Sequence, residues 1–305
     1  MIKKIKNKIP ITVDNSPSLM YERKRWKHFL VAPFAFILTF WVAIKKMIFG
    51  SKLKTNTFWV DGISPICREV KDTAKGWRAV DILYNYEFGK RTGLEGKIAD
   101  FWLDMLNAQA MRNRLKLVKK CLKEEIERLQ KEKSDIKILS VASGSAQGVI
   151  DVLQEFKQKG LFIKVILLDL DPSALEHSKV LARKAGVIEQ IKYVNKSARE
   201  LEEVAKGFNP DIIEIVGFLE YRPQESTIRL VKRSHRLLAP NGVLLTSSVS
   251  PNIESLFLHH VVNWPMIHRS LKQFINALIK GGFTEFKIIY EPLKIQKIAV
   301  CRKEM

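Results

Sequence analysis

The sequence has little cysteine and lacks the sequence patterns of several common kinds of site. Three cysteines, Cys67, Cys121 and Cys301, are spread over 305 residues and form no CxxC pair. We therefore expect neither a metal site nor a disulfide framework, and a reducing compartment. The GxGxxG pattern of dinucleotide enzymes is missing, as is the phosphate-binding GxxxxGK pattern followed by serine or threonine. This argues against NAD and ATP as cofactors.

Acidic residues are scarce beside basic ones, with 32 Asp and Glu against 52 Lys and Arg, for a net charge of +20. A clustered basic surface attracts polyanions such as nucleic acids. Here, however, residues 1–56 carry 12 lysines and arginines against two acidic residues, and so a charge of +10. Half of the excess charge thus belongs to the N-terminal segment, which argues against a general nucleic-acid surface.

Apolar runs long enough to cross a bilayer are missing as well. The run at 29–44 has 16 residues, about 24 Å as a helix against a bilayer core of about 30 Å. Basic clusters flank both of its ends, which opposes a single span, and no signal-peptide cleavage site follows. We expect residues 23–54 to form an interfacial helix, or a shallow hairpin bent at Pro33, on anionic lipid. A buried helix packed on the domain is the alternative. The first interpretation implies a cytoplasmic protein peripheral to the inner face of the cell membrane.

The remaining chain changes its periodicity near residue 134. Residues 57–133 show helical spacing of apolar residues, and 134–305 alternate short apolar runs with helical stretches. This indicates a membrane-associating extension over 1–56, a helical cap over 57–133 and an α/β domain over 134–305. We expect a doubly wound, mainly parallel, seven-stranded sheet. Its C-terminal pair, 285–291 and 295–302, must be antiparallel because its connection is too short for a crossover.

Two elements of the α/β domain indicate a nucleoside site. The small residues of 143–148 follow the first expected strand, where ligands collect in open α/β sheets. Asp169 follows the second strand, where a carboxylate can accept both hydroxyl protons of a ribose. Together they form a nucleoside-binding pair.

The motifs at these places resemble those of the class I S-adenosylmethionine-dependent methyltransferases. Residues 138–146 (ILSVASGSA) resemble the first motif and 168–175 (LDLDPSAL) the second. Residues 237–245 (LLAPNGVLL) and 270–283 (SLKQFINALIKGGF) resemble later elements, so the similarity covers about 136–303. The resemblance implies the Rossmann-like fold, S-adenosyl-L-methionine as cofactor and a set of cofactor-binding residues: Ser140, Ala142, Ser143, Gly144, Ser145, Ala146, Asp169, Leu170, Ser197 and Ala198.

Three departures from the family pattern concern this site. Ser140 stands where many members have an acidic residue, and Ala142 and Ala146 replace flanking glycines. After the third strand, where an Asp commonly meets the adenine amino group, the chain has Asn195, Lys196 and Ser197. Ser197 or the backbone would then make that contact. A degenerate site that no longer binds cofactor is the alternative.

Candidate catalytic residues follow the fourth and fifth strands. Glu220 and Tyr221 lie after the fourth strand, at the edge that faces the cofactor methyl group in such folds, and could orient substrate. The segment lacks the motif typical of base methylation, which weakens a DNA or RNA base as substrate. His259, His260 and His268 follow the fifth strand, and we take His268 as a further catalytic candidate. Methyl transfer needs positioning and exclusion of water more than a base.

A weaker resemblance concerns residues 107–114 (NAQAMRNR), which are similar to a segment of bacterial proteins assigned to hydroxy-fatty-acid methyl ester biosynthesis. It implies that Arg112 or Arg114 binds a substrate carboxylate, for which arginine has the matching geometry. The sequence thus predicts a methyltransferase for a small or lipid-like acceptor, with a carboxylate as the candidate acceptor group. An RNA methyltransferase and a non-catalytic cofactor-binding scaffold are the alternatives.

Overall fold

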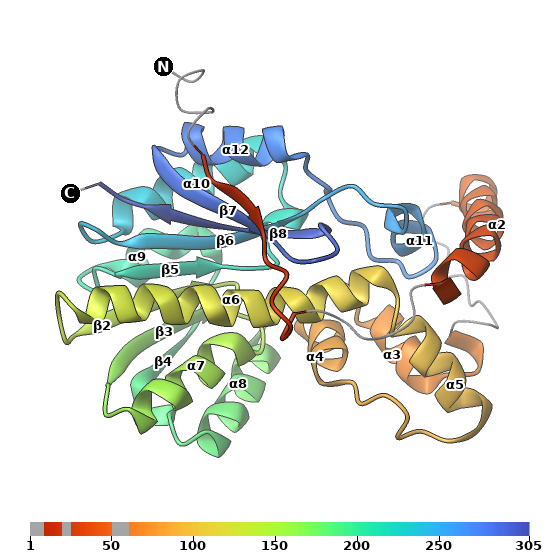
Figure 1. The fold of residues 1–305 in the computed structure, drawn as a ribbon, viewed down its shortest axis with the longest axis horizontal. Helices are drawn as coiled ribbons and strands as arrows, with labels where there is room; N and C mark the ends of the chain where they lie inside the picture. Colours follow the sequence, from red (N-terminus) through yellow and green to blue (C-terminus); the bar gives the residue numbers. More distant parts are fainter. Residues whose placement is uncertain (1–8, 20–25, 51–60, 305) are drawn as a thin grey trace. The chain divides into compact units, whose positions relative to one another are not determined.

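The computed structural model describes residues 9–19, 26–50 and 61–304 (Figure 1). The chain divides into two compact units. Unit 1 contains residues 1–19, 114–250 and 267–305, and unit 2 contains 20–113 and 251–266. The expected boundaries after residues 56 and 133 therefore do not coincide with the division in the structure, because long-range contacts rather than chain order define each unit.

Unit 1 is built on one eight-stranded sheet with the order β1-β7-β8-β6-β5-β2-β3-β4. Neighbouring strands are parallel except that β8 runs antiparallel to both β6 and β7. The expected doubly wound, mainly parallel sheet with an antiparallel C-terminal hairpin is confirmed. The strands are β1 (Ile11–Val13), β2 (Ile136–Val141), β3 (Ile163–Asp169), β4 (Ile191–Asn195), β5 (Ile212–Ile215), β6 (Val243–Val249), β7 (Glu285–Tyr290) and β8 (Gln296–Arg302).

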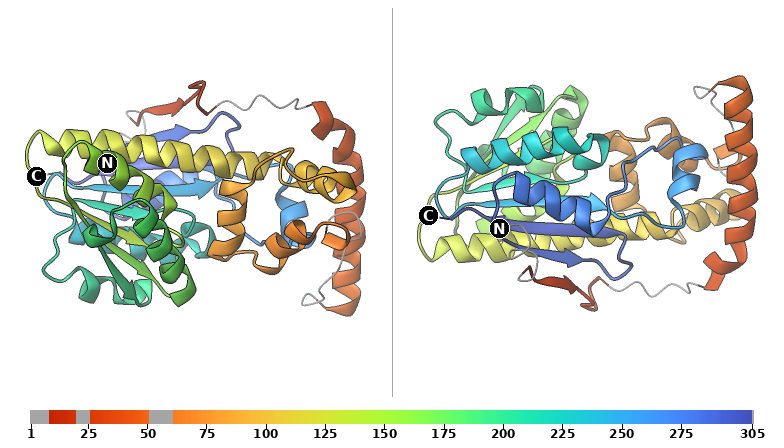
Figure 2. Two further views of the ribbon diagram at one scale, coloured as in Figure 1. Left: turned by 90° about the horizontal axis from the view of Figure 1, so that it is seen from below. Right: turned by 90° about the horizontal axis from the view of Figure 1, so that it is seen from above.

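Helices cover both faces of this sheet, and each face has its own apolar core (Figures 1 and 2). Strands β2, β3, β5 and β6 are almost wholly buried, as expected for parallel strands covered on two sides. The burial of both faces supplies the main stabilisation, at about 25 cal/mol per Å² of apolar surface. One core includes α6 (Leu106–Gln130, from residue 114), α7 (Gln147–Gln158) and α8 (Pro172–Lys184); the other includes α9 (Leu201–Ala205), α10 (Gln224–Leu237) and α12 (Leu271–Lys280).

The first described residues belong to this sheet, which the sequence did not predict. Strand β1 pairs with β7 in parallel and adds an eighth strand to the seven expected. Asp14 pairs with Lys120 of α6 at 2.7 Å, and Leu19 is 2% exposed within the core that contains α6. Residues 9–19 are therefore part of unit 1, although they were expected in the membrane-associating extension.

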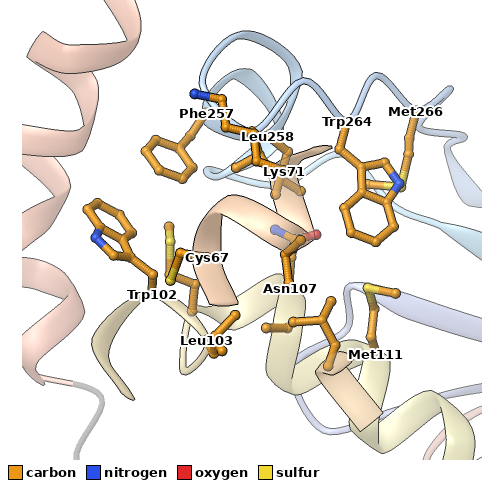
Figure 3. A pocket seen from close by; sticks show the side chains of 15 residues that line it. Cys67, Lys71, Trp102, Leu103, Asn107, Met111, Phe257, Leu258, Trp264 and Met266 are labelled. Atoms are coloured by element: carbon orange, nitrogen blue, oxygen red, sulfur yellow. The ribbon is translucent and has the colours of Figure 1, made fainter. Parts of the chain in front are cut away.

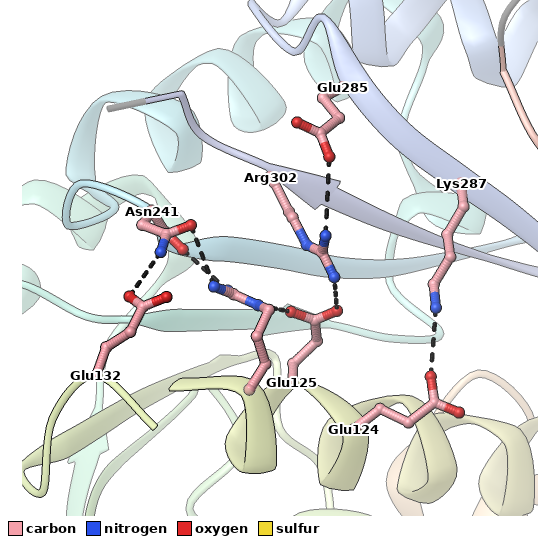
Figure 4. A network of polar contacts seen from close by, with 8 residues as sticks. Glu124, Glu125, Glu132, Asn241, Glu285, Lys287 and Arg302 are labelled. Atoms are coloured by element: carbon pink, nitrogen blue, oxygen red, sulfur yellow. Dashed lines mark hydrogen bonds and ion pairs between the residues drawn. The ribbon is translucent and has the colours of Figure 1, made fainter. Parts of the chain in front are cut away.

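A buried polar network joins α6 to the C-terminal strands (Figure 4). Glu125 accepts hydrogen bonds from Arg302 of β8 at 2.9 Å and from Arg128 at 2.7 Å. Burial raises the pKa of Glu125, but these two hydrogen bonds outweigh burial and hold this pKa below its usual value. Arg128 also donates to the carbonyl of Asn241 at 2.9 Å. The network holds α6 on the sheet through charge-assisted bonds that the buried carboxylate requires.

Unit 2 is helical in its described parts. It contains α2 (Trp26–Phe49), α3 (Pro65–Asp72), α4 (Trp77–Asn85), α5 (Gly93–Trp102), the first residues of α6 and α11 (Ser255–His260). Glu254 accepts hydrogen bonds from the backbone N–H groups of Leu106 and Asn107 at 2.9 and 2.8 Å. A carboxylate at this end satisfies free helical N–H groups and complements the helix dipole, so it stabilises the start of α6.

Helix α2 corresponds to the apolar run of the sequence. It is one continuous helix (Figure 2). Pro33 lies inside it, so of the two expected forms the helix is present and the hairpin bend at Pro33 is not. Its inner face packs against α11, where Lys46 donates to the carbonyl of His260 at 2.8 Å. Among residues 9–19, 26–50 and 61–304, no helix combines the length and hydropathy that crossing a membrane requires.

Candidate functional site

The candidate cofactor loop leaves the carboxyl end of β2 with an unusual backbone. Ala142, Gly144 and Ala146 have φ values of 53°, 55° and 52°, so every second residue of the loop is left-handed. Glycine adopts this conformation without penalty, whereas alanine does not. Ala142 and Ala146, which replace glycines of the motif that this loop resembles, therefore keep the conformation at an energetic cost. Strain of this kind is typical of ligand-binding loops.

Asp169, at the end of the adjacent strand β3, holds this loop in place. Its Oδ2 accepts the backbone N–H of Gly144 at 2.8 Å and its Oδ1 that of Asp171 at 2.8 Å. Burial raises the pKa of Asp169, although these hydrogen bonds oppose the shift. Each carboxylate oxygen can accept further hydrogen bonds, so the expected contact with two sugar hydroxyls remains available. The next side chain, Leu170, is 70% exposed and could lie against a nucleobase.

Two further groups of the loop suit a ligand with polar ends. The hydroxyl of Ser143 is buried and has no hydrogen-bond partner among the described residues. Helix α7 starts directly after Ala146, which offers no side-chain cap to the first N–H groups. Such a helix start attracts negative charge, for instance a carboxylate. The loop thus fits a nucleoside that carries an amino-acid tail, which is the composition of the expected cofactor.

Ser197 and Ala198 lie at the start of a short 3-10 helix, η3 (Ala198–Glu200). The Ser197 hydroxyl accepts the N–H of Arg199 at 3.2 Å, while its own N–H donates to Glu200 at 2.9 Å. Its side chain therefore serves a local cap. Asn195, which the sequence analysis did not assign, instead reaches the site and donates to the carbonyl of Leu170 at 3.0 Å.

Glu214 lies beside the candidate cofactor loop, and the sequence analysis did not select it. It is the register partner of Ser140 on the neighbouring strand β5, and Ser140 Oγ donates to its Oε2 at 2.5 Å. Burial raises the pKa of Glu214 to about 7, against the hydrogen bond of Ser140 and the charge of Arg114. A lone acidic residue within the apolar strand Ile212–Ile215 was the available signal.

Glu220, the expected catalytic carboxylate, lies in the 3-10 helix η4 (Leu219–Tyr221) after β5 and is 2% exposed. Its Oε1 is 3.9 Å from Arg114 and accepts a 3.4 Å hydrogen bond from Ser247. Its Oε2 is buried with no hydrogen-bond partner among the described residues. Burial raises the pKa of Glu220, although the charge of Arg114 opposes the shift. The group is therefore an enclosed carboxylate beside an arginine.

The other expected residues are distributed over both units. Tyr221 ends η4 and is half-buried, and His268 is half-buried in unit 1. His259 and His260 belong to unit 2, with ring centroids 4.6 Å apart, so the three histidines are not one cluster within a single unit. Within the described ranges, no group of three His, Cys, Asp or Glu residues could hold a metal ion.

Arg112 is anchored in unit 2. Its guanidinium donates to the carbonyl of Leu83 at 3.3 Å, is 4.0 Å from Asp104 and lies 5.0 Å from the ring centre of Phe88. The two candidate arginines thus have different surroundings. Arg112 lies among helices of unit 2, whereas Arg114 pairs with Glu220 of unit 1.

Unit 2 contains an apolar cavity of about 60 Å³ (Figure 3). Two of its aromatic residues, Trp102 and Phe257, stack with ring centres 5.0 Å apart. At its wall the Lys71 ammonium pairs with buried Asp61 at 2.9 Å. The lining is otherwise almost wholly apolar and includes three methionines. It comprises Cys67, Val70, Lys71, Leu83, Trp102, Leu103, Met105, Asn107, Ala108, Met111, Phe257, Leu258, Val262, Trp264 and Met266.

Comparisons with known proteins give one family and several related folds. A family model described as "Putative methyltransferase" matches residues 39–301. The chain is similar in structure to a "possible exported protein" from Bordetella parapertussis, with 15% identity and a TM-score of 0.65 over 96% of this chain and 100% of that chain. A comparison with curated protein sequences finds no match.

Two solved methyltransferases have a similar fold. Magnesium protoporphyrin IX methyltransferase (ChlM) from Synechocystis PCC 6803, solved with bound SAH, shares 11% identity with a TM-score of 0.52. The similarity covers 75% of this chain and 92% of that one. The CurJ carbon methyltransferase shares 14% identity with a TM-score of 0.53, over 81% and 68% of the two chains. At these identities the likeness concerns the fold.

Proposed function

The chain belongs to the "Putative methyltransferase" family, and from this premise we propose that it transfers a methyl group from S-adenosylmethionine to the carboxylate of a small apolar acid. The observation that carries the acceptor class is the apolar cavity of unit 2. The product would be a methyl ester.

The cofactor assignment is supported by the loop of unit 1. Asp169 suits the sugar hydroxyls, Leu170 the base, and Ser143 with the start of α7 the polar tail. When bound, S-adenosylmethionine supplies a methyl group activated by its sulfonium. The Synechocystis structure with bound SAH is in line with this choice.

The apolar body of the acceptor is supported by the chemistry of the cavity. Apolar cavities stay dry and take up apolar ligands, because water finds too few hydrogen-bond partners in them. Met105, Met111 and Met266 have flexible side chains and can adapt the walls to a ligand larger than the present volume. We therefore expect an acyl chain or a similar group there.

The carboxylate as acceptor group is supported by the burial of two acidic residues of unit 1. Glu214 and Glu220 are buried, at 8% and 2% exposure, and thus poorly placed to take a proton from a substrate. A carboxylic acid is already ionised at neutral pH and needs none. Arg112 would pair with this carboxylate, since its planar guanidinium can hold both oxygens.

The test uses labelled S-adenosylmethionine with straight-chain fatty acids of graded length and the matching alcohols. We expect methyl esters from the acids. Leu258→Trp should abolish ester formation because Leu258 lines the cavity, whereas Leu256→Trp should not, because Leu256 is on the same helix but 60% exposed. Methylation of alcohols alone, of RNA, or equal effects of both variants would contradict the proposal.

The membrane-facing role expected for residues 23–54 is supported by the outer face of α2. Its apolar residues recur with helical spacing and are 58–80% exposed. A contiguous apolar face of this kind marks an interaction site, and basic residues within and around the helix suit anionic lipid. We therefore propose the surface of an anionic bilayer as the partner of this face, with the protein at the inner side of the cell membrane. The face consists of Phe36, Ile37, Phe40, Trp41, Met47, Ile48 and Phe49.

Sedimentation with vesicles tests this contact. The protein should bind phosphatidylglycerol vesicles and lose binding at least tenfold in Phe40→Ser with Trp41→Ser. Leu94→Ser, which removes another exposed apolar side chain of unit 2, should bind normally. Equal binding by both variants, or a concentration-dependent dimer that the α2 changes abolish without any vesicle binding, would contradict the assignment to lipid.

A further inference from the structure

We propose that Glu214 binds the ammonium group of the S-adenosylmethionine tail, in place of the acidic residue that the first motif lacks. The inference rests on the proposed function, since it requires this cofactor. Glu214 is outside the first motif, on a strand that lies 74 positions after Ser140 in the chain.

The position of Glu214 follows from strand register. Ser140 is one residue before the end of β2, and Glu214 is one residue before the end of β5. The two strands are parallel neighbours and pair these residues with each other. Their carboxyl ends therefore meet at the same edge of the sheet, where the loop that starts at Ala142 also begins. The carboxylate thus lies one strand, about 4.8 Å, away from the position of Ser140, where many members of the resembled family have an acidic residue.

The hydrogen bond from Ser140 shows how the carboxylate of Glu214 can take the place of an acidic residue in the first motif. Ser140 Oγ donates to Glu214 Oε2, so the hydroxyl holds the carboxylate toward the motif instead of providing a charge itself. The other oxygen, Oε1, retains its acceptor capacity, because Ser140 is the one hydrogen-bond donor to this carboxylate among the described residues.

The charge balance indicates a cationic ligand. Burial raises the pKa of Glu214 although the hydrogen bond of Ser140 and the positive charge of Arg114 oppose the shift, so these two groups do not fully compensate the buried carboxylate. A buried carboxylate that is not fully compensated costs free energy unless it takes up a proton or a cation. The tail of the cofactor carries an ammonium, so its binding would supply the missing charge.

Each neighbour of Glu214 has a defined character. On β2 the register partner is Ser140, on β6 it is Leu245, and α6 contributes the charge of Arg114. Since burial places the pKa of Glu214 at about 7, bound ammonium should stabilise the ionised form and release a proton. Affinity for S-adenosylhomocysteine should therefore fall about tenfold between pH 8 and pH 6, and this dependence should vanish in Glu214→Gln.

The experiment compares two ligands by calorimetry with the full-length protein. S-adenosylhomocysteine has the amino-acid tail, whereas 5′-methylthioadenosine lacks it. Glu214→Gln should weaken binding of the first ligand about ten- to hundredfold, as expected for a charged hydrogen bond, and leave the second nearly unchanged. Glu125→Gln removes another buried carboxylate of unit 1, outside the candidate site, and should keep the ratio of the two affinities. Thermal unfolding of each variant verifies that it folds.

The outcomes separate this inference from the proposed function. If the wild-type protein binds neither ligand, both are overturned. If it binds both and Glu214→Gln keeps their affinity ratio, or loses both affinities equally, the role of Glu214 is overturned while the cofactor assignment stands.

Discussion

The left-handed alanines of the cofactor loop allow a prediction opposite to the usual effect of glycine. Ala142 has a φ of 53°, a conformation that costs an L-residue about 1–2 kcal/mol. Ala142→Gly removes this cost. It also adds conformational freedom to the unfolded chain, which costs about 0.4–1 kcal/mol. The free energy of unfolding should therefore stay the same or rise by about 1 kcal/mol.

A helical alanine provides the matched comparison. Ala174 is fully buried in α8, where glycine is about 1 kcal/mol less favourable than alanine and the lost methyl group adds a further cost. Ala174→Gly should therefore lower the free energy of unfolding by at least about 1 kcal/mol. Ala142 is preferred over Ala146 for the test, because Ala146 is 7% exposed and part of the apolar core.

Urea unfolding followed by circular dichroism measures the difference. The midpoint of Ala142→Gly should equal or exceed that of the wild type, and that of Ala174→Gly should fall below it. Affinity for S-adenosylhomocysteine should change less than twofold in Ala142→Gly, because the loop keeps its backbone conformation. A loss of stability in Ala142→Gly as large as in Ala174→Gly would refute the reasoning from backbone strain.

Three further predictions follow from single contacts. Arg112→Gln should raise KM for the fatty acid about tenfold or more with little change in kcat, whereas the surface variant Arg78→Gln should leave KM unchanged. Equal KM values for the two variants would exclude a contact between Arg112 and the carboxylate. Leu19→Ala should lower the free energy of unfolding by about 2–5 kcal/mol, since Leu19 is 2% exposed. Ile11→Ala should lower it little, since Ile11 is 46% exposed. Similar losses of stability in the two variants would contradict the role of Leu19 in the core. Because the pKa of Glu214 is raised to about 7 in the folded protein, this group stabilises the ligand-free fold below its ordinary pKa and loses that effect as pH rises toward 7. The unfolding free energy of the wild type relative to Glu214→Gln should therefore fall from pH 5 to pH 7, and a constant difference would refute the shift.

The local parts of the site could be predicted from the sequence. The loop at 142–146 directly follows β2 and Asp169 is the last residue of β3, so their place at the sheet edge is a property of short segments. The alternation of strands and helices also predicts the parallel sheet, because it depends on the period of apolar residues. The short connection before β8 predicts the antiparallel hairpin, because a parallel pair would need a longer crossover.

Contacts between distant segments could not be predicted in this way. A run of three apolar or β-branched residues is too short to identify a strand from the sequence, as is the case for Ile11, Thr12 and Val13. These residues form a strand because they pair with β7 at the edge of the sheet. The cavity of unit 2 gathers residues from Cys67 to Met266, none of which forms a motif with its neighbours.

Glu214 separates the two kinds of information most clearly. Residues close together in the chain are enough to predict that the first motif has the uncharged Ser140, that Asp169 stands at the end of the second expected strand and that the fold is α/β. The position of Glu214 beside Ser140 follows from the folded sheet alone, since the register between β2 and β5 is set by packing of the whole sheet. A slip of one residue would turn this carboxylate to the opposite face.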